Sequence, residues 1–270
     1  MNSKYKVLKY NSNKFENVED LISIEEPLEI SLKFKDKDKW ITKILSITMR
    51  TPGDDQHLVR GFLFNEQIVQ NIKDIESIES FGDKVGQYNI QNKILVTLNN
   101  SENINIVNIK RDFITNSSCG VCGKSSLDAL EIIKQNKTNS DQPKISKEII
   151  IQSPSILKES QSEFSKTGGI HASGLFNSNG NLISVKEDVG RHNALDKLLG
   201  AMALQSINTA NGYVLMSSRC SYEIVEKSAK RGIKAIVSIS GPTAFALRKA
   251  NEANITLYSL DKNRVIEIKL

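Results

Sequence analysis

The residues best suited to chemistry are two cysteines in a loop of small residues. Cys119 and Cys122 lie in the segment Ser117–Lys124 (SSCGVCGK), where glycines on both sides of Cys122 let the backbone move and a large partner approach. A predicted helix follows, and helix N-terminal amides together with Lys124 favour thiolate over thiol. A thiolate can take the outer sulfur from the persulfide of a donor enzyme. An acceptor then removes it, or the second cysteine expels it by closing a disulfide.

The same spacing is compatible with other chemistry. A CxxC pair is half of a Cys₄ zinc site, but no second pair completes it, because Cys220 is the one other cysteine and the three histidines are scattered. A thioredoxin-like redox role requires the motif to follow a strand of a compact βαβ unit, whereas this motif follows a strand-rich segment and a long loop. Cys220 has no cysteine near it and is expected to be a buried, unreactive side chain. Spacing alone therefore leaves the chemistry of the CxxC pair open.

Three polar turns in the C-terminal half are candidates for binding an anion. They cover residues 188–193, 217–219 and 238–243, and each one joins a predicted strand to a predicted helix. Such turns lie at the carboxyl ends of parallel strands, where α/β sheets bind ligands, and free helix N-terminal amides suit phosphate. The candidate side chains are Arg191, His192, Ser218, Arg219 and Ser240. For the first turn, a structural pair between Asp188 and Arg191 with a capping His192 is an equally good interpretation.

The part of the chain before residue 115 is predicted to differ in structure from the part that contains these turns. Residues 1–114 are predicted to form a small β-rich domain with one helix, because apolar residues alternate in several runs and the stretch Leu58–Phe64 has helical spacing. The predicted strands cover residues 28–34, 41–49, 75–81, 94–98 and 104–109. The cysteine loop, a helix from Leu127 to near Gln135 and a polar linker occupy residues 115–145.

Residues 146–270 are predicted to form a layered α/β domain. After a helix at 149–158 and a hairpin that turns at Asn179-Gly180, helices and strands alternate. The hairpin strands are predicted at 171–176 and 182–186, the later strands at 213–217, 233–239 and 255–260, and the helices at 193–204, 222–231 and 243–253. This alternation implies crossover connections and a largely parallel sheet.

The composition bounds the possible partners. A formal net charge of +5 fits an anionic ligand or an acidic partner, but Lys and Glu alternate instead of forming a basic stripe, which argues against nucleic acid. No apolar run approaches the roughly 20 residues that span a bilayer. The polar N-terminal sequence lacks the apolar segment of a signal peptide. We therefore expect a cytoplasmic protein that does not bind a membrane.

Several longer motifs occur in a distinctive order. The longest is Glu187–Leu198 (EDVGRHNALDKL), which follows Thr167–Ser173 (TGGIHAS). The cysteine loop, Arg60–Leu63 (RGFL), Ser217–Glu223 (SSRCSYE) and Ser240–Ala244 (SGPTA) extend the set from about residue 25 to about residue 265. Together these motifs resemble the formate dehydrogenase accessory sulfurtransferase family, FdhD.

The resemblance implies a sulfurtransferase. Such a protein accepts sulfur from a cysteine desulfurase and passes it to the bis-guanine-dinucleotide form of the molybdenum cofactor, which is then inserted into formate dehydrogenase. A guanine nucleotide such as GDP would mimic part of this bound substrate, and the protein would be a homodimer. By the family pattern, Cys119 holds the persulfide and Cys122 supports or resolves it.

The resemblance also implies cofactor contacts near the C-terminus. The matching residues are Leu260, Asp261, Lys262, Asn263 and Arg264. This segment departs from the family pattern, in which an aromatic residue is expected at position 260 and glycine follows. Lys262 and Arg264 can still meet a phosphate or a guanine edge, but stacking on the base would be lost.

The implied main domain has a cytidine-deaminase-like fold without the hydrolytic chemistry. Zinc deaminases need a His-x-Glu, whose Glu is the general acid and base, and a later Pro-Cys-x-x-Cys. In this chain Ser173 follows His171 in place of that Glu, and the CxxC precedes the histidine. We therefore expect a deaminase-like scaffold with neither deaminase activity nor zinc. The alternatives to a sulfur carrier are a molybdenum-cofactor chaperone without persulfide chemistry, in which the cysteines only ligate metal, and a structural zinc protein.

Overall fold

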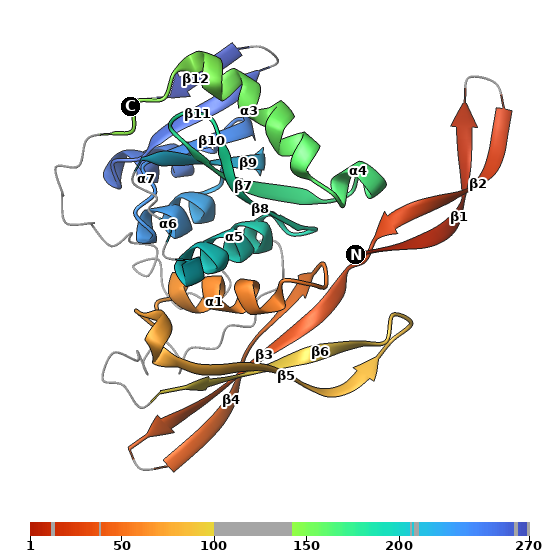
Figure 1. The fold of residues 1–270 in the computed structure, drawn as a ribbon, viewed down its shortest axis with the longest axis vertical. Helices are drawn as coiled ribbons and strands as arrows, with labels where there is room; N and C mark the ends of the chain where they lie inside the picture. Colours follow the sequence, from red (N-terminus) through yellow and green to blue (C-terminus); the bar gives the residue numbers. More distant parts are fainter. Residues whose placement is uncertain are drawn as a thin grey trace.

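Three β-sheets organise the chain (Figure 1). The structure is a computed structural model that describes residues 1–11, 14–37, 39–99, 142–205, 207, 211–261 and 264–268. Within these ranges there are a two-stranded ribbon, a four-stranded sheet and a six-stranded sheet. None of the described helices is long and apolar enough to span a membrane.

The N-terminal ribbon is an element that the sequence pattern did not predict. It pairs β1 (Asn2–Asn11) with β2 (Lys14–Ser23) in an antiparallel register and extends away from the rest of the molecule (Figure 1). Tyr10 packs on Phe15 across the ribbon, with ring centroids 4.8 Å apart. At its base, the Ser23 hydroxyl donates to Thr167 Oγ1 at 2.7 Å, which ties the ribbon to the main body.

The four-stranded sheet buries one face against a helix. Its order is β4-β3-β6-β5, and its core is built from alternating apolar residues of the strands and from the apolar side of helix α1. The elements are β3 (Glu26–Asp36), β4 (Lys39–Arg50), α1 (Asp55–Asn65), the 3₁₀ turn η1 (Ile72–Asp74), β5 (Ile75–Val85) and β6 (Ile90–Leu98). These observations confirm the predicted hairpin, the helix and two further strands. The strand predicted at 104–109 and the helix predicted from Leu127 lie outside the described residues.

The six-stranded sheet carries helices on both faces. Its order is β12-β11-β10-β9-β7-β8, in which β9, β10 and β11 are parallel while β7 and β12 run the opposite way. Helices α5, α6 and α7 share one apolar core with the sheet, and α3 packs in a second core on the other face. The strands are β7 (His171–Asn177), β8 (Leu182–Asp188), β9 (Gly212–Arg219), β10 (Ala235–Ser240), β11 (Thr256–Asp261) and β12 (Arg264–Ile268). The helices are α3 (Lys147–Ser160), α4 (Phe164–Thr167), α5 (Arg191–Gln205), α6 (Tyr222–Lys230) and α7 (Ala244–Glu252).

The predicted fold class is confirmed, since the chain is an α/β protein with a smaller β-rich N-terminal part. Each element predicted after residue 146 is present, and the structure adds β12 and the short α4. The boundary at residues 114 and 115 lies outside the described residues, so the division into domains stays a prediction.

Helices α1 and α5 join the two sheets. The helices cross so closely that a Cβ at Gly61 would overlap the backbone of Asp196, and a Cβ at Gly200 would overlap the backbone of His57. Glycine at these two positions therefore lets the backbones approach. The close crossing fixes the N-terminal part against the helix that begins at Arg191, which is one of the candidate site residues.

Candidate functional site

The strand directions gather the predicted site residues along one edge of the six-stranded sheet. Strand β8 runs antiparallel to β7, which runs antiparallel to β9, so β8 through β11 end at the same edge while β7 and β12 begin there. We call this edge, with its turns and helix starts, the polar edge. It carries His171, Asp188, Arg191, His192, Ser218, Arg219, Ser240, Asp261 and Arg264.

At the first turn of the polar edge, Asp188 is paired with Lys197 and not with Arg191. The Lys197 ammonium lies 2.7 Å from Asp188 Oδ2, and the two side chains are 2% and 0% exposed. Asp188 also accepts hydrogen bonds from the Thr51 and Gly190 amides. Of the two interpretations of this turn, the Asp188–Arg191 pair is therefore wrong.

Arg191 is consequently available to a ligand. Its side chain is half-buried, and its guanidinium forms no hydrogen bond or ion pair with any other residue that the structure describes. A guanidinium presents a planar fork of donors, which suits phosphate and carboxylate oxygens.

His192 is held by residues from the next helix. Its Nε2 lies 2.6 Å from Glu223 Oε2 and 3.3 Å from the Ser221 hydroxyl. Both partners come from the start of α6, where Ser221 is the N-cap residue and Glu223 lies in the first turn. His192 is therefore not a simple cap of its own helix, and its ring has a defined orientation at the polar edge.

His171 is a part of the site to which sequence reasoning gave no ligand-binding role. Ser217 Oγ accepts a hydrogen bond from the Ala172 amide at 2.8 Å and lies 3.4 Å from His171 Nδ1. Burial and the positive charges of Arg191 and His192 lower the pKa of His171. The side chains of Arg191 and His192 are therefore close enough to His171 to interact with it electrostatically. The histidine of the TGGIHAS motif was the sequence signal that could have found it.

The remaining predicted residues differ in how accessible they are. Arg219, Ser240, Asp261 and Arg264 are exposed. Ser218 is buried, and its hydroxyl donates to the Arg219 carbonyl at 3.1 Å. Leu260 is 8% exposed and belongs to the apolar core beneath α3, so its side chain is not placed to contact a ligand at the polar edge. Lys262 and Asn263 lie outside the described residues, as do Cys119 and Cys122.

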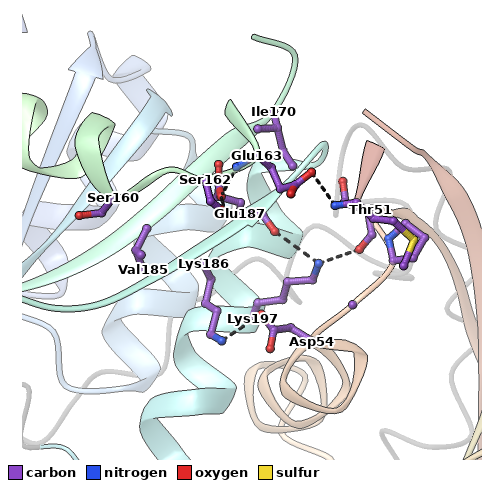
Figure 2. A pocket seen from close by; sticks show the side chains of 13 residues that line it. Thr51, Asp54, Ser160, Ser162, Glu163, Ile170, Val185, Lys186, Glu187 and Lys197 are labelled. Atoms are coloured by element: carbon purple, nitrogen blue, oxygen red, sulfur yellow. Dashed lines mark hydrogen bonds and ion pairs between the residues drawn. The ribbon is translucent and has the colours of Figure 1, made fainter. Parts of the chain in front are cut away.

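A cavity of about 250 Å³ lies beside β8, between this strand and the segment that precedes α1 (Figure 2). Its charged residues are already paired: Lys186 Nζ lies 2.9 Å from Asp54 Oδ2, and Lys197 donates to the Thr51 carbonyl at 2.8 Å. Glu187 accepts from the Phe164 amide at 2.9 Å. The cavity is lined by none of the predicted site residues, and its satisfied polar groups give it no evident ligand.

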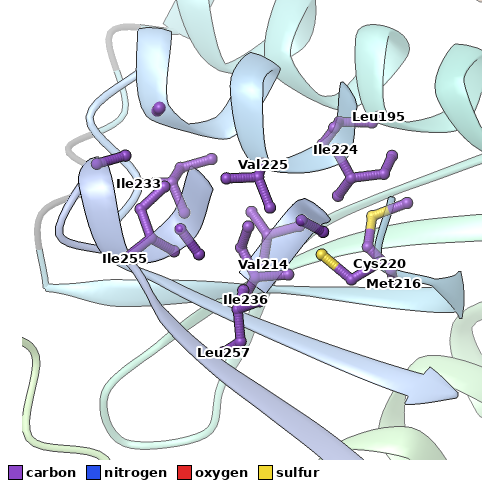
Figure 3. Packing of buried hydrophobic residues seen from close by; sticks show 14 of the residues in the cluster. Leu195, Val214, Met216, Cys220, Ile224, Val225, Ile233, Ile236, Ile255 and Leu257 are labelled. Atoms are coloured by element: carbon purple, nitrogen blue, oxygen red, sulfur yellow. The ribbon is translucent and has the colours of Figure 1, made fainter. Parts of the chain in front are cut away.

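The prediction that Cys220 is buried is confirmed. It is 1% exposed and packs among apolar side chains, including Met216 and Ile224 (Figure 3). Burial raises the pKa of Cys220 to about 12, so the side chain stays a thiol at neutral pH. Among the described residues, no group of three or more His, Cys, Asp or Glu side chains could hold a metal ion.

Comparison with known proteins extends these observations. The sequence pattern of the FdhD/NarQ family matches residues 24–268. The chain is 40% identical over 250 residues to the sulfur carrier protein FdhD of Saccharolobus solfataricus, covering 92% of this chain and 88% of that protein. It is 41% identical over 247 residues to the protein of that name from Sulfurisphaera tokodaii, covering 91% and 88%.

A solved structure has the same fold. The crystal structure of a candidate formate dehydrogenase accessory protein from Desulfotalea psychrophila superposes with a TM-score of 0.71, at 24% sequence identity. The alignment covers 98% of this chain and 96% of the other.

Proposed function

The chain belongs to the FdhD/NarQ family, and from this premise we propose that it is a sulfur carrier for the molybdenum cofactor. It takes sulfur from a cysteine desulfurase as a persulfide on Cys119. It delivers this sulfur to the bis-guanine-dinucleotide form of the cofactor, which is then inserted into formate dehydrogenase. The main support for this proposal is that the family match, over residues 24–268, includes both the CxxC loop and the polar edge.

Loading of the carrier is a thiol–disulfide type of exchange. The Cys119 thiolate attacks the outer sulfur of the donor's persulfide, so that a new S–S bond forms while the donor's S–S bond breaks and the donor cysteine leaves as a thiolate. Closure of a Cys119–Cys122 disulfide would expel the carried sulfur as hydrosulfide, with the two electrons supplied by the cysteines. A dithiol reductant would then have to reopen the disulfide. In direct transfer, an acceptor removes the outer sulfur and Cys119 is left as a thiolate.

The polar edge supports binding of the nucleotide part of this substrate. Arg191, Arg219 and Arg264 bring three guanidinium groups to the side of the sheet where His171 and His192 also lie. Ligands of α/β proteins bind at the carboxyl ends of the strands, and phosphate oxygens suit such donors. Guanosine diphosphate is the corresponding probe, since it carries the base and the pyrophosphate of the substrate.

The residue that follows Ala172 in the His171-Ala172-Ser173 segment supports our proposal that the protein is not a deaminase. Ser173 is fully buried and donates to the Met216 sulfur at 3.2 Å, so a hydroxyl stands where a deaminase requires a carboxylate.

We propose further that the protein acts in the cytoplasm as a homodimer, and that it uses no zinc.

Mass spectrometry of the desulfurase-treated protein tests the proposal. The full-length protein is incubated with a cysteine desulfurase and free cysteine, and its peptides are then analysed. We expect one additional sulfur on the peptide that contains Cys119, and none there in the Cys119→Ser variant. If an active desulfurase adds no sulfur to the wild-type protein while GDP still binds, the protein is a cofactor chaperone and not a carrier.

A further inference from the structure

We infer that the ribbon β1–β2 is a dimerisation arm, one face of which packs on the same face of the ribbon in a second copy of this chain. The inference rests on the proposed function in one respect, since it names a surface through which the two copies of the homodimer meet. It does not depend on the chemistry of the cysteine loop. The family match begins at residue 24, directly after the ribbon ends at Ser23, so that match does not include this element.

The ribbon is joined to the main body at its base. There, Asn2 Nδ2 donates to Glu163 Oε2 at 2.9 Å, and the Tyr5 hydroxyl lies 2.7 Å from that of Tyr88. From this base the two strands extend away from the rest of the described chain (Figure 1). A two-stranded hairpin is at best marginally stable in water by itself. A further surface that packs on the ribbon would therefore stabilise it.

Three large apolar side chains gather on one face near the tip of the ribbon. Leu8, Tyr10 and Phe15 are 60%, 63% and 69% exposed, the highest values among the large apolar side chains that the structure describes. Tyr10 lies opposite Phe15 in the register, and Leu8 precedes Tyr10 by two residues, so all three belong to one face, which we call the arm face. Lys9 and Glu16 lie on the other face. Aromatic side chains grouped in this way are typical of the centre of a protein interface.

The arm face continues toward the base as a row of opposite charges. Lys6 lies opposite Glu19 in the register, two residues before Leu8, and therefore on the same face. Lys6 forms no ion pair with any other residue that the structure describes. Glu19 lies 3.6 Å from Lys4, but these two side chains are 62% and 72% exposed, so their pair contributes little. Both charges of this row can therefore be engaged by a partner.

The arm face is complementary to itself. A two-fold interface joins the same patch of both copies, so such a patch must match itself. When β1 of one copy lies on β2 of the other, with both tips at the same end, Tyr10 meets Phe15 of the partner subunit. In the same arrangement Lys6 meets Glu19 of the partner subunit, because each residue lies over its own cross-strand neighbour. Aromatic rings thus face aromatic rings, and a cation faces an anion.

Other symmetric arrangements of two ribbons bring like charges together. The lysines at positions 4, 6 and 9 belong to β1, whereas Glu16, Glu19 and Asp20 belong to β2. Packing β1 on β1, or pairing these strands edge to edge, places the lysines of one copy beside those of the other, and pairing β2 with β2 does the same for the carboxylates. Like charges that lie opposite one another are destabilising. The charge pattern therefore favours face-to-face packing of β1 on β2.

The size of the arm face sets the strength of the contact. Each strand has ten residues, so the ribbon is about 33 Å long, and its two strands are together about 10 Å wide. Each copy thus offers about 330 Å² on this face, which is less than half of the roughly 800 Å² per partner in a standard interface. A dimer that depends on the ribbons should therefore dissociate on dilution.

Sedimentation velocity of the full-length protein over a range of concentrations tests the inference. We expect the wild type to dimerise reversibly. The double variant Tyr10→Ser/Phe15→Ser should raise the dissociation constant at least about 30-fold, because each copy loses its two aromatic anchors. The ribbon extends away from the two cores, so the melting temperature of the main body should stay unchanged.

A charge exchange separates contact between copies from effects within one ribbon. Lys6→Glu places two carboxylates in the charged row, and Glu19→Lys places two ammonium groups there. Each variant alone should dimerise about tenfold more weakly than the wild type, because like charges then meet across the interface. An equal mixture of the two variants should form a heterodimer about as readily as the wild type forms its dimer. In that heterodimer opposite charges meet again, although each ribbon keeps its own pair of like charges.

The matched controls are Lys9→Glu and Glu16→Lys. These residues also lie opposite one another across the ribbon, but on the other face. Each control should dimerise like the wild type. If the controls weaken the dimer as much as Lys6→Glu and Glu19→Lys do, or if the mixture of the latter two dimerises no better than either alone, the inference is overturned.

The dimerisation and sulfur-loading experiments fail independently. If the wild type is monomeric at every concentration but accepts sulfur on Cys119, the arm and the homodimer are wrong and the sulfur carrier stands. If the wild type forms a dimer that all the ribbon variants leave intact, the copies meet elsewhere and only the arm is wrong. If the protein is monomeric and Tyr10→Ser/Phe15→Ser slows its loading by the desulfurase, the arm face binds the donor enzyme instead of a second copy.

Discussion

Substitution of Lys197 by methionine should destabilise the protein through Asp188. Methionine keeps most of the length of the lysine stem but removes the ammonium, which lies 2.7 Å from Asp188 Oδ2 and donates to the Thr51 carbonyl at 2.8 Å. The carboxylate of Asp188 is 0% exposed, so water cannot replace the lost charge. A buried charge without its partner is the principal cost of this substitution.

The magnitude follows from what remains around Asp188. Removing one member of a buried ion pair costs about 3–5 kcal/mol. Asp188 keeps hydrogen bonds from the amides of Thr51 and Gly190 and from Asn193 Nδ2, which stabilise part of its charge. We therefore expect a loss of about 3 kcal/mol in the free energy of unfolding for Lys197→Met. Asp188→Asn removes the unpaired buried charge. The double variant Asp188→Asn/Lys197→Met should therefore have a free energy of unfolding at least about 1 kcal/mol higher than that of Lys197→Met.

Urea denaturation of the wild type, both single variants and the double variant measures these differences as a double-mutant cycle. Lys93→Met is the control, because its pair with Glu29 is 3.9 Å long and Lys93 is 53% exposed; its effect should stay below about 1 kcal/mol. If Lys197→Met costs no more than Lys93→Met, or if the double variant is the sum of the two singles, the buried pair does not hold the polar edge in place.

Three further predictions concern packing, thiol reactivity and pH. Gly200→Ala should lower the melting temperature and destabilise by about 1–3 kcal/mol, because its Cβ would overlap the α1 backbone, whereas Gly241→Ala, with open space around it, should be near neutral in the same thermal melts. Cys220→Ala should leave sulfur loading on Cys119 unchanged in the mass-spectrometric assay, because burial raises the pKa of Cys220 to about 12; loss of loading would contradict an unreactive Cys220. The lowered pKa of His171 means that the folded state favours the neutral ring. This preference contributes to the free energy of unfolding above pH 6.5, the pKa of the unfolded state, and the contribution is lost as pH falls through the lower pKa of the folded state. Urea titrations below about pH 6.5 should therefore show a shallower loss of stability in His171→Gln than in the wild type, and equal slopes would refute this role.

The extended ribbon β1–β2 shows why some elements are hard to predict. Its strands are rich in charged residues, and lysines of β1 face acidic residues of β2, such as Lys6 opposite Glu19 and Lys9 opposite Glu16. A sequence of this kind has little of the apolar alternation that indicates a half-buried strand. The ribbon is specified mainly by backbone pairing between its strands and by contacts at its base, including Ser23 with Thr167.

Elements that bury an apolar face could be predicted from the sequence. Apolar alternation in β3 and β4, and the short apolar runs of β9, β10 and β11, predict these strands because side-chain periodicity is a local property of the backbone. The order of helices and strands predicted that the polar turns share one edge. The motif around Arg191 and His192 singled out two residues of the polar edge before their surroundings were known.

The contacts of these side chains, in contrast, became evident from the folded structure. His192 and Glu223 belong to different helices, and Asp188 is paired with Lys197 although Arg191 is closer in sequence. Leu260 was predicted near the cofactor, but the register of β11 turns its side chain into the core beneath α3. The physical reason is common to these cases: ion pairs and burial depend on which surfaces pack together across the fold, and local sequence patterns do not contain that information.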